Sequence, residues 1–467
     1  MKICLQKLLI VLAVAAVISP APAQVFTNLH NFSVNGGPNY TNFDGDIPNA
    51  GLVLSGTTLY GAAEYGGASN CGTIFRVNTD GSGFTNLHSF SNSIDGQTPV
   101  ATLLLSGNTL FGTTYYGGAS TNGTIFRINT NGSGFMNLHS FAPTINDTNA
   151  DGANPYAALI VTNGLLYGTT LNGGLYGSGT VFAIGTNGLN FTNLHSFEAL
   201  LNYTNSEGGH PYGSLVLAGT NVLYGTAYGG GYIGCGTFFR IGVTGGTTFT
   251  NLHTFYSGYD GNGPFGGLIL VSNTIYGTTY SGGDDNQGLL YSTDTNATAI
   301  NEVYYFSGSD GAYPECTLAL AGNTFYGTTS AGGAANNGTV FAVNLDGTGF
   351  VSLHSFSAHD PVTFTNSDGF WPYAGVAVSS NVVYGTTWAG GYHDEGVLFS
   401  ILVEPMLAIA LAGTNVVVTW PTSFSGYNLF STTNLAPPVN WSAVAGQYVV
   451  TNAISAAKQK FYRLRNP

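Results

Sequence analysis

Short apolar runs alternate with turn-forming residues along almost the whole chain, at a spacing that predicts β-strands. Between residues 99 and 141, the runs PVATLLL, TLFGTTYY, GTIFRIN and FMNLHSF are separated by segments rich in Gly, Asn and Ser. Runs of this length with such punctuation are typical of antiparallel strands joined by tight turns. We predict four strands, A to D, at 99–105, 109–116, 123–129 and 135–141.

The same unit recurs along the chain. Each copy has an Asp-Gly-x-x-Pro turn or a close variant, an apolar run, a Tyr-Gly-Thr-Thr run leading to Gly-Gly, and a Gly-Thr-Val-Phe run followed by Leu-His-Ser-Phe. The turn prolines number seven: Pro48, Pro99, Pro155, Pro211, Pro264, Pro314 and Pro372. A four-stranded unit of about 50 residues in seven copies predicts an all-β, seven-bladed β-propeller rather than a solenoid.

The first and last units are incomplete in a complementary way. VFTNLHNF, residues 25–32, is a strand D with no strands A to C before it, and the seventh unit ends at GVLFSI, residues 396–401, without a strand D. Pairing of these two segments would complete the seventh blade and leave no long exposed sheet edge. We therefore predict a ring closed by the N-terminal strand.

These motifs resemble the GloVer tandem repeats of exported bacterial proteins. The resemblance covers residues 25–402 and holds in all seven copies, although the sixth strand D reads Val303-Tyr304-Tyr305-Phe306 and has no histidine. It implies a propeller-like repeat array with a variable C-terminal segment that anchors or sorts the protein. It implies no particular activity.

Both ends of the chain depart from the repeat. Residues 1–23 carry Lys2 and Lys7, an apolar run and Ala21-Pro22-Ala23, the pattern of a cleaved signal peptide. We expect a propeller at 24–402 and a small C-terminal β-sandwich-like module at 403–467. The expected location is outside the cytoplasm: periplasmic, cell-surface or extracellular.

Charge is scarce and mostly negative. Charged residues make up 7% of the chain, against about 25% for an average soluble domain. Between residues 24 and 403 the only basic side chains that always carry charge are Arg76, Arg127 and Arg240. A phosphate backbone or an anionic membrane surface would be repelled, so we expect no nucleic-acid partner, and no apolar run after residue 23 is long enough to span a membrane. Cys71 and Cys235 fall at the same place in two separated repeats, so we expect no disulfide framework.

Two repeated series could carry chemistry. We expect the acidic residue before the turn Gly to accept hydrogen bonds from backbone N–H groups of its turn, with a Ca²⁺-binding ring as the alternative. The strand-D histidines would lie far apart around the rim, and we expect them to bond between neighbouring blades instead of binding a metal. The series are Asp44, Asp95, Asp151, Glu207, Asp260, Asp310 and Asp368, and His30, His88, His139, His195, His253 and His354. We predict no cofactor and no metal.

The longest loops between strand D and the next strand A lead into the seventh and first units, which ring closure makes neighbours. Variable loops on a rigid scaffold commonly bind ligands. Together with the loop WAGGYHDEG, these segments contain the expected binding residues: Tyr40, Phe364, Trp371, Tyr373, Trp388, Tyr392, His393, Asp394 and Glu395. The alternative is that these aromatic side chains only pack beneath their own loops.

Aromatic faces beside polar groups suit a neutral, hydroxyl-rich ligand. We predict a monomeric exported protein that binds carbohydrate or another cell-surface polymer, or a cell-surface protein. One alternative is a polysaccharide hydrolase or lyase that uses the loop cluster of the seventh and first units, including His359 and Asp360. Another is a structural surface protein without a specific ligand. No nucleophile elbow, zinc-helix motif or phosphate loop is present in the sequence, so an enzyme is the less favoured reading.

Overall fold

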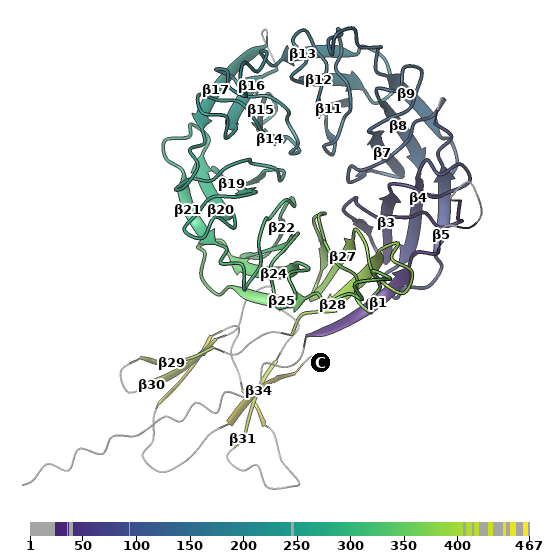
Figure 1. The fold of residues 1–467 in the computed structure, drawn as a ribbon. Coiled ribbons are helices and arrows are strands. Elements are labelled where there is room, and N and C mark those ends of the chain that lie inside the picture. Colours follow the sequence, from purple (N-terminus) through teal and green to yellow (C-terminus); the bar gives the residue numbers. More distant parts are fainter. Residues whose placement is uncertain are drawn as a thin grey trace, which may run out of the picture.

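A computed structural model of the chain shows a closed ring of seven four-stranded sheets around an axis (Figure 1). It describes residues 24–34, 36, 41–92, 94–243 and 247–404 continuously. In the C-terminal segment it describes 408–412, 415–419, 428–432, 442–444, 449–453 and 461–465. The expected signal peptide lies outside these residues. The described residues form strands and no helix, so none of them belongs to a helix long and apolar enough to cross a membrane.

Each blade runs from strand A near the axis to strand D at the rim. Blade 1 consists of β2 (Val53–Ser55), β3 (Thr58–Ala63), β4 (Thr73–Asn78) and β5 (Thr85–Ser89). Blade 2 consists of β6 (Leu104–Ser106), β7 (Thr109–Thr114), β8 (Thr124–Asn129) and β9 (Met136–Ser140). Blade 3 consists of β10 (Ile160–Thr162), β11 (Leu165–Thr170), β12 (Thr180–Gly185) and β13 (Thr192–Ser196). Blade 4 consists of β14 (Val216–Ala218), β15 (Val222–Ala227), β16 (Thr237–Gly242) and β17 (Thr248–Thr254). Blade 5 consists of β18 (Ile269–Val271), β19 (Thr274–Thr279), β20 (Leu289–Asp294) and β21 (Asn301–Tyr305). Blade 6 consists of β22 (Ala319–Ala321), β23 (Thr324–Thr329), β24 (Thr339–Asn344) and β25 (Val351–Ser355). Blade 7 consists of β26 (Ala377–Ser379), β27 (Val382–Thr387), β28 (Val397–Leu402) and β1 (Val25–Asn31).

Blade 7 joins the two ends of the repeat array, as predicted. Strand β1 pairs antiparallel with β28, from Val25 opposite Leu402 to Asn31 opposite Val397. Phe32, directly after β1, is fully buried and packs edge-on against Phe75 of blade 1 at 5.4 Å between ring centroids. The ring is therefore closed by backbone pairing within blade 7 and by apolar packing onto blade 1.

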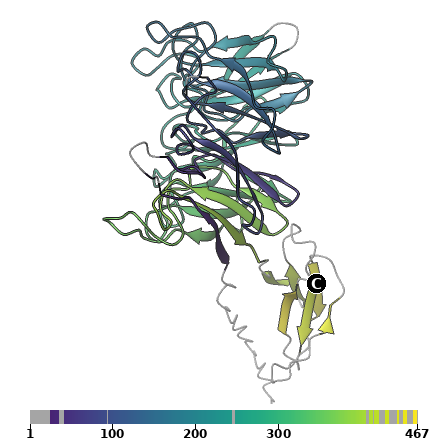
Figure 2. The same ribbon diagram turned by 90° about the vertical axis from the view of Figure 1, so that its right-hand side faces the viewer.

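The C-terminal segment contains two further sheets, and their strands lie outside the disc (Figure 2). Their order is β29-β30-β33 and β32-β31-β34. The strands are β29 (Ala408–Ala412), β30 (Asn415–Thr419), β31 (Asn428–Thr432), β32 (Ser442–Ala443), β33 (Val449–Ala453) and β34 (Phe461–Arg465). Leu429 is buried in one cluster with Val403 and Val376 of the blade 7 region. A separate module at 403–467 with sandwich-like packing stays a prediction.

The hydrophobic core lies between neighbouring blades, and the Tyr-Gly-Thr-Thr motif serves this packing. Gly112 of β7 lies opposite Phe126 of β8, and a Cβ at Gly112 would stand only 2.5 Å from Phe126 Cζ. Any larger residue would displace the buried Phe126 ring. Thr114 and Thr124 join the same strands through a buried hydroxyl hydrogen bond of 2.8 Å. The repeated glycine and threonines therefore have structural roles.

Strand A is shorter than the sequence predicted. The run 99–105 was expected to be a strand, but β6 covers only 104–106. Nearer the axis, the backbone makes hydrogen bonds with the next blade: Gly51 N–H donates to Thr102 Oγ1 at 3.1 Å, and Gly267 N–H donates to Thr317 Oγ1 at 3.0 Å. Neighbouring blades converge there, so these segments bond between blades instead of extending their own sheet.

The repeated histidines and acidic residues form pairs with each other. His88 Nε2 lies 2.9 Å from Asp95 Oδ2, and Asp95 also accepts hydrogen bonds from the backbone N–H and hydroxyl of Ser91. The other pairs are His30–Asp44, His139–Asp151, His195–Glu207, His253–Asp260 and His354–Asp368, at 2.7 to 3.0 Å. Each acidic residue accepts a backbone N–H bond, but the donor is the residue that follows strand D and not the Asp-Gly-x-x-Pro turn as expected, and histidine is an additional partner. The described residues contain no cluster of three or more potential metal ligands of the His, Cys, Asp or Glu type.

Five of the six histidines contact the next blade, but by ring stacking and not by the predicted hydrogen bond, which goes to the acidic residue of the connecting loop. The ring of His88 in blade 1 stacks on Phe135 of blade 2, with centroids 3.8 Å apart. In blade 5, Tyr304 replaces histidine: its hydroxyl donates to Asp310 at 2.6 Å, and its ring stacks on Phe350 of blade 6 at 4.2 Å. A flat ring with a hydrogen-bonding tip therefore meets the requirement of this position. The described cysteines, Cys71, Cys235 and Cys316, are free.

Truncation of Phe32 should destabilise the ring. Phe32→Ala leaves a cavity between blades 7 and 1, at a cost of about 3–5 kcal/mol. Val25→Ala in the same segment is the control, because Val25 is 51% exposed. Chemical denaturation would measure both changes, and equal stability of the two variants would contradict closure by buried packing.

Acid should destabilise the propeller through its buried aspartates. Burial raises the pKa of Asp44, Asp95 and Asp368, but hydrogen bonds from the paired histidine and the neighbouring serine outweigh burial, so each pKa lies below the ordinary 3.8. A carboxyl group whose pKa is lower in the folded protein than in the unfolded chain stabilises the fold at pH values above its unfolded-state pKa. This stability is lost as the pH falls through the folded-state pKa. Asp95→Asn should cost about 2 kcal/mol at pH 7 and little at pH 2 to 3, measured by thermal unfolding. The exposed Asp147→Asn is the control; equal loss at both pH values would refute the assignment.

Candidate functional site

The residues on either side of each turn proline, just before strand A, place a ring of side chains around the axis. The residue before each turn proline is in the left-handed region, with φ between 54° and 65°. Its N–H donates to the preceding blade, as in Trp371 N–H to Asn337 O at 3.0 Å and Ile47 N–H to Glu395 O at 3.0 Å. Each blade is thereby held by its neighbour at the axis, and the residue after the proline faces a central pocket.

This pocket is lined by the residue after the proline from all seven blades: Asn49, Val100, Tyr156, Tyr212, Phe265, Glu315 and Tyr373. Its cavity volume is about 70 Å³. Since one water needs about 10–15 Å³ on this measure, the pocket can hold a few waters or one small polar group. We call it the central pocket.

Aromatic rings form one wall of the central pocket, on blades 3 to 5. Tyr212 stacks on Phe265 with ring centroids 4.1 Å apart, and Tyr156 packs edge-on against Tyr212 at 5.1 Å. Tyr228, from the end of strand B in blade 4, packs edge-on against Phe265 at 5.4 Å. These rings are in mutual contact, so the wall is continuous.

Blade 7 supplies a second aromatic group, which we call the tryptophan cluster: Trp371, Trp388 and Tyr373. Trp371 and Trp388 lie 5.7 Å apart between ring centroids, and Tyr373 meets Trp388 edge-on at 6.4 Å. All three side chains are half-buried. Trp371 precedes strand A and Trp388 follows strand B, so both lie on the face of the disc that carries the D-to-A and B-to-C loops. Tyr373 connects them to the pocket lining. We call this end of the central pocket its loop-face mouth.

Two carboxyl groups flank the tryptophan cluster, one in each neighbouring blade. In blade 6, Glu315 Oε1 accepts a 2.8 Å hydrogen bond from Ser330 Oγ. In blade 1, Glu64 Oε2 accepts a long 3.4 Å bond from Asn49 Nδ2. Burial raises the pKa of Glu315 to about 7, and burial also raises that of Glu64.

Both carboxyl groups act electrostatically on tyrosines that line the central pocket. Burial raises the pKa of Tyr373 to about 12, with a further contribution from the negative charge of Glu315. Burial likewise raises the pKa of Tyr156, and the charges of both Glu315 and Glu64 add to this rise. Tyr156 projects from blade 3, whereas the two glutamates come from blades 6 and 1. The carboxyl groups therefore act across the central pocket.

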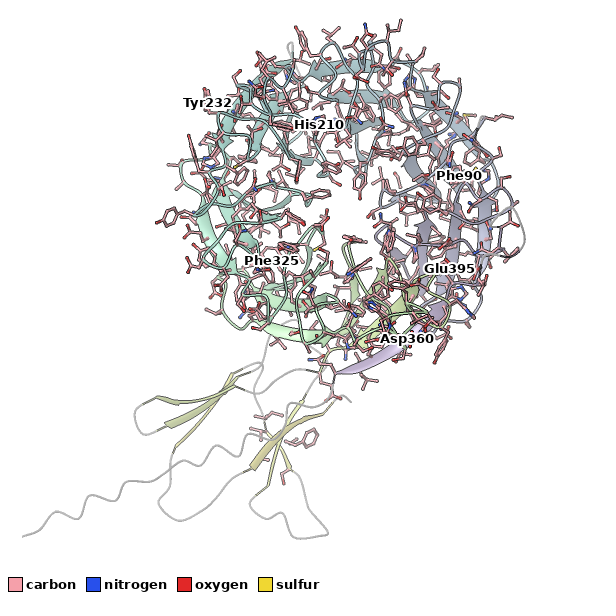
Figure 3. All side chains as sticks on the ribbon, viewed as in Figure 1. Phe90, His210, Tyr232, Phe325, Asp360 and Glu395 are labelled. Carbon is pink, nitrogen blue, oxygen red and sulfur yellow. The ribbon has the colours of Figure 1, made fainter. Side chains whose placement is uncertain are left out.

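The structure brings together some of the sequence-predicted site residues. Trp371, Tyr373 and Trp388 meet in the tryptophan cluster, and Phe364 joins it indirectly: His359 lies between Phe364 and the buried Phe370, at ring distances of 5.6 Å and 4.5 Å, and Phe370 meets Trp371 at 4.9 Å. Glu395, on the loop between β27 and β28, lies beside blade 1 and accepts a hydrogen bond from Ile47 N–H (Figure 3). Phe370, which was not among the expected binding residues, is buried beneath its own loop.

The remaining predicted residues do not converge on the central pocket. Tyr392 and His393 are exposed on the loop after β27. Asp394 Oδ1 accepts a 3.1 Å bond from Gly390 N–H within that loop, and burial raises its pKa. Glu395 contributes its carbonyl oxygen to the blade 1 contact described above. Tyr40 lies outside the described residues.

Sequence reasoning missed Glu64, Glu315 and the aromatic wall. The available signal was the variation at two otherwise regular positions, the residue after the turn proline and the residue after Tyr-Gly-Thr-Thr. The second series reads Glu64, Tyr115, Leu171, Tyr228, Tyr280, Ser330 and Trp388. Glutamate occurs once in each series: Glu315 lines the central pocket, and Glu64 bonds to Asn49, which also lines it.

Exposed apolar side chains also gather on the loops of blades 3 to 5, away from the expected site. Tyr203 is 83% exposed and Tyr232 is 70% exposed, and the backbones of their loops meet where Asn205 N–H donates to Gly231 O at 3.2 Å. Tyr232 lies toward the outer edge of the ring (Figure 3). This outer surface is separate from the central pocket lining.

Comparison with known proteins supports the repeat assignment and the fold. The family described as the Gloeobacter/Verrucomicrobia repeat matches residues 17–239, 143–283 and 210–431. No curated protein sequence matches the chain.

Similar solved structures are distant in sequence. Oligogalacturonate lyase from Vibrio parahaemolyticus matches with 10% identity and a TM-score of 0.50, over 81% of this chain and 93% of the lyase. TolB from Acinetobacter baumannii matches with 13% identity and a TM-score of 0.38, over 59% of this chain and 58% of TolB. At these identities the likeness concerns the fold alone.

Replacing Glu315 should stabilise the protein in a pH-dependent way. A carboxyl group whose pKa is raised from 4.5 to about 7 on folding contributes its full stability at pH values below its unfolded-state pKa. This stability is lost as the pH rises through about 7. Glu315→Gln should therefore raise the melting temperature at pH 8 and leave it nearly unchanged at pH 4. The exposed Glu302→Gln should have no such effect. A Gln variant that is less stable at pH 8 would show that ionised Glu315 is well solvated or paired.

Proposed function

The chain belongs to the Gloeobacter/Verrucomicrobia repeat family, and from the geometry of its site we propose that it is an exported binding protein for a hydroxyl-rich carbohydrate polymer. The ligand binds at the loop-face mouth of the central pocket. Export is proposed from the charged start, apolar run and small residues of the first 23 positions.

The observation that carries this proposal is the tryptophan cluster. Trp371, Tyr373 and Trp388 occupy three different positions of the repeat, yet their rings are in contact at one mouth of the pocket. Broad half-buried rings offer apolar surface for the C–H face of a sugar, and nearby polar groups can bind its hydroxyls. Other blades place smaller or different side chains at these positions, so the cluster is not a requirement of the repeat.

The charge of the site favours a ligand without negative charge. Glu315 and Glu64 flank the cluster, while the three arginines of residues 24–403 lie on the third strands β4, β8 and β16 of their blades. An acidic polysaccharide would meet two carboxyl groups at the mouth and no nearby arginine. A neutral or positively charged carbohydrate is therefore preferred.

A hydrolase or lyase is the second candidate, and one observation favours it. Glu315, with a pKa raised by burial to about 7, could serve as a general acid or base near neutral pH. Glu64 would be its carboxylate partner, as glycoside hydrolysis commonly requires two such groups. The cavity volume of about 70 Å³ favours binding, because it cannot enclose a sugar ring between the two carboxyl groups.

Binding should depend on both tryptophans. A glycan array probed with residues 24–467 would identify ligands, and Trp371→Ala and Trp388→Ala should each weaken binding by about tenfold or more, equivalent to about 1.4 kcal/mol, because each removes stacking surface. The control is Tyr259→Ala, since Tyr259 is 83% exposed on a loop of blade 5.

The outcomes separate the candidate functions. Intact ligand bound by wild type and lost in both tryptophan variants supports the binding function, whereas shortened ligand detected by mass spectrometry supports the enzyme. Loss of binding only in Tyr259→Ala would move the site to the outer loops of blades 3 to 5. If no glycan binds, the protein acts as a structural surface protein or binds another partner.

A further inference from the structure

We propose that the central pocket binds a protonated amine, so that the preferred carbohydrate carries free amino groups. This inference rests on the proposed carbohydrate function and specifies its ligand. The sugar ring would stack on the tryptophan cluster at the mouth, and its ammonium group would enter between Glu315 and Glu64.

The first argument is the set of hydrogen-bond acceptors in the pocket. Glu315 accepts a side-chain hydrogen bond from Ser330, and Glu64 accepts one from Tyr65 and a second, long one of 3.4 Å from Asn49, so acceptor capacity remains on both carboxyl groups. Asn49 Oδ1 is buried and has no partner among the described residues. Buried acceptors are normally satisfied, and an ammonium group brings three donors that can be shared among several acceptors.

The second argument is that no Lys or Arg side chain among the described residues balances the carboxyl groups at the pocket. Arg76, Arg127 and Arg240 are the only arginines of the repeat region, which has no lysine, and all three lie on third strands away from the axis. A half-buried carboxylate is stabilised by an opposite charge within about 4–6 Å. None of the described residues that line the pocket is a Lys or Arg, so a bound cation would supply this charge.

The third argument is the aromatic lining. Tyr212, Phe265 and Tyr156 form a continuous wall, and Tyr373 lies on the opposite side beside Glu315. The faces of such rings attract cations. The half-buried carboxyl groups beside these rings distinguish this pocket from a site for a neutral hydroxyl, which needs no opposite charge.

The size and composition of the pocket favour an amine over other cations. A volume of about 70 Å³ accommodates an ammonium group, whose size is close to that of a water, while the attached ring stays outside. Calcium takes six to eight oxygen ligands, and no group of three or more His, Cys, Asp or Glu side chains converges in the described chain. A metal ion would therefore be poorly coordinated here.

Amine binding should be linked to proton release. With a pKa of about 7, Glu315 is largely protonated at pH 6, and an ammonium ligand favours its ionised form. The complex should release up to one proton at pH 6 and little at pH 8.5. This behaviour follows from the amine and would not accompany stacking of a neutral sugar.

The experiment compares two oligosaccharides of equal length, a glucosamine oligomer and its N-acetylated counterpart, by calorimetry at pH 6 in two buffers of different ionisation enthalpy. We expect the glucosamine oligomer to bind at least about tenfold more tightly and to release protons. Glu315→Gln should reduce this preference about tenfold and abolish proton release, whereas the exposed Glu302→Gln should change neither. Melting curves confirm that each variant is folded.

The outcomes distinguish this inference from the proposed function. Equal binding of both oligomers, lost in Trp371→Ala, would refute the amine subsite and retain carbohydrate binding. Binding of neither oligomer, together with a negative glycan array, would overturn both. A preference for glucosamine that persists unchanged in Glu315→Gln and in Glu64→Gln would place the amine elsewhere and refute the inference.

Discussion

Pairing of β1 with β28 is the constraint on which the rest of the molecule depends. The sheets of the blades pack mainly against their two neighbours, so without this pairing the last blade would present a bare sheet edge and an uncovered apolar face. The N-terminal strand supplies the outer strand of blade 7 from the other end of the repeat array. Closure covers both ends of the array at once. It also makes blades 7 and 1 neighbours, and the central pocket exists only in the closed ring.

Two layers of inter-blade contact maintain the ring at different radii. At the rim of every blade except blade 4, a histidine or tyrosine ring stacks on the next blade while its polar tip bonds to the carboxylate of the connecting loop. Near the axis, backbone N–H groups bond to the adjacent blade. Because the axis contacts are made largely by backbone atoms, side chains facing the pocket are free to vary.

This freedom explains how one repeat can carry a localised site. The residue after the turn proline has the same backbone in every blade, yet it is an amide, an aliphatic, an aromatic or an acid in different copies. Only blade 7 contributes two tryptophans, and its neighbours contribute the two glutamates. A ring with approximate sevenfold symmetry thus acquires one chemically distinct sector, with aromatic surface at the mouth and negative charge below it.

The sequence by itself determined the all-β class, the seven units, the closing strand and the structural nature of the repeated histidines and acids. Those features depend on local periodicity and on a requirement common to every blade, both of which are visible in a one-dimensional pattern. It also indicated Trp371, Tyr373 and Trp388, because they stand where the repeat varies. It could not show that Glu315 and Glu64, about 250 residues apart in the chain, flank those rings. Only the tertiary structure decided this, because convergence at the axis and the burial that raises the carboxyl pKa values arise from the closed ring.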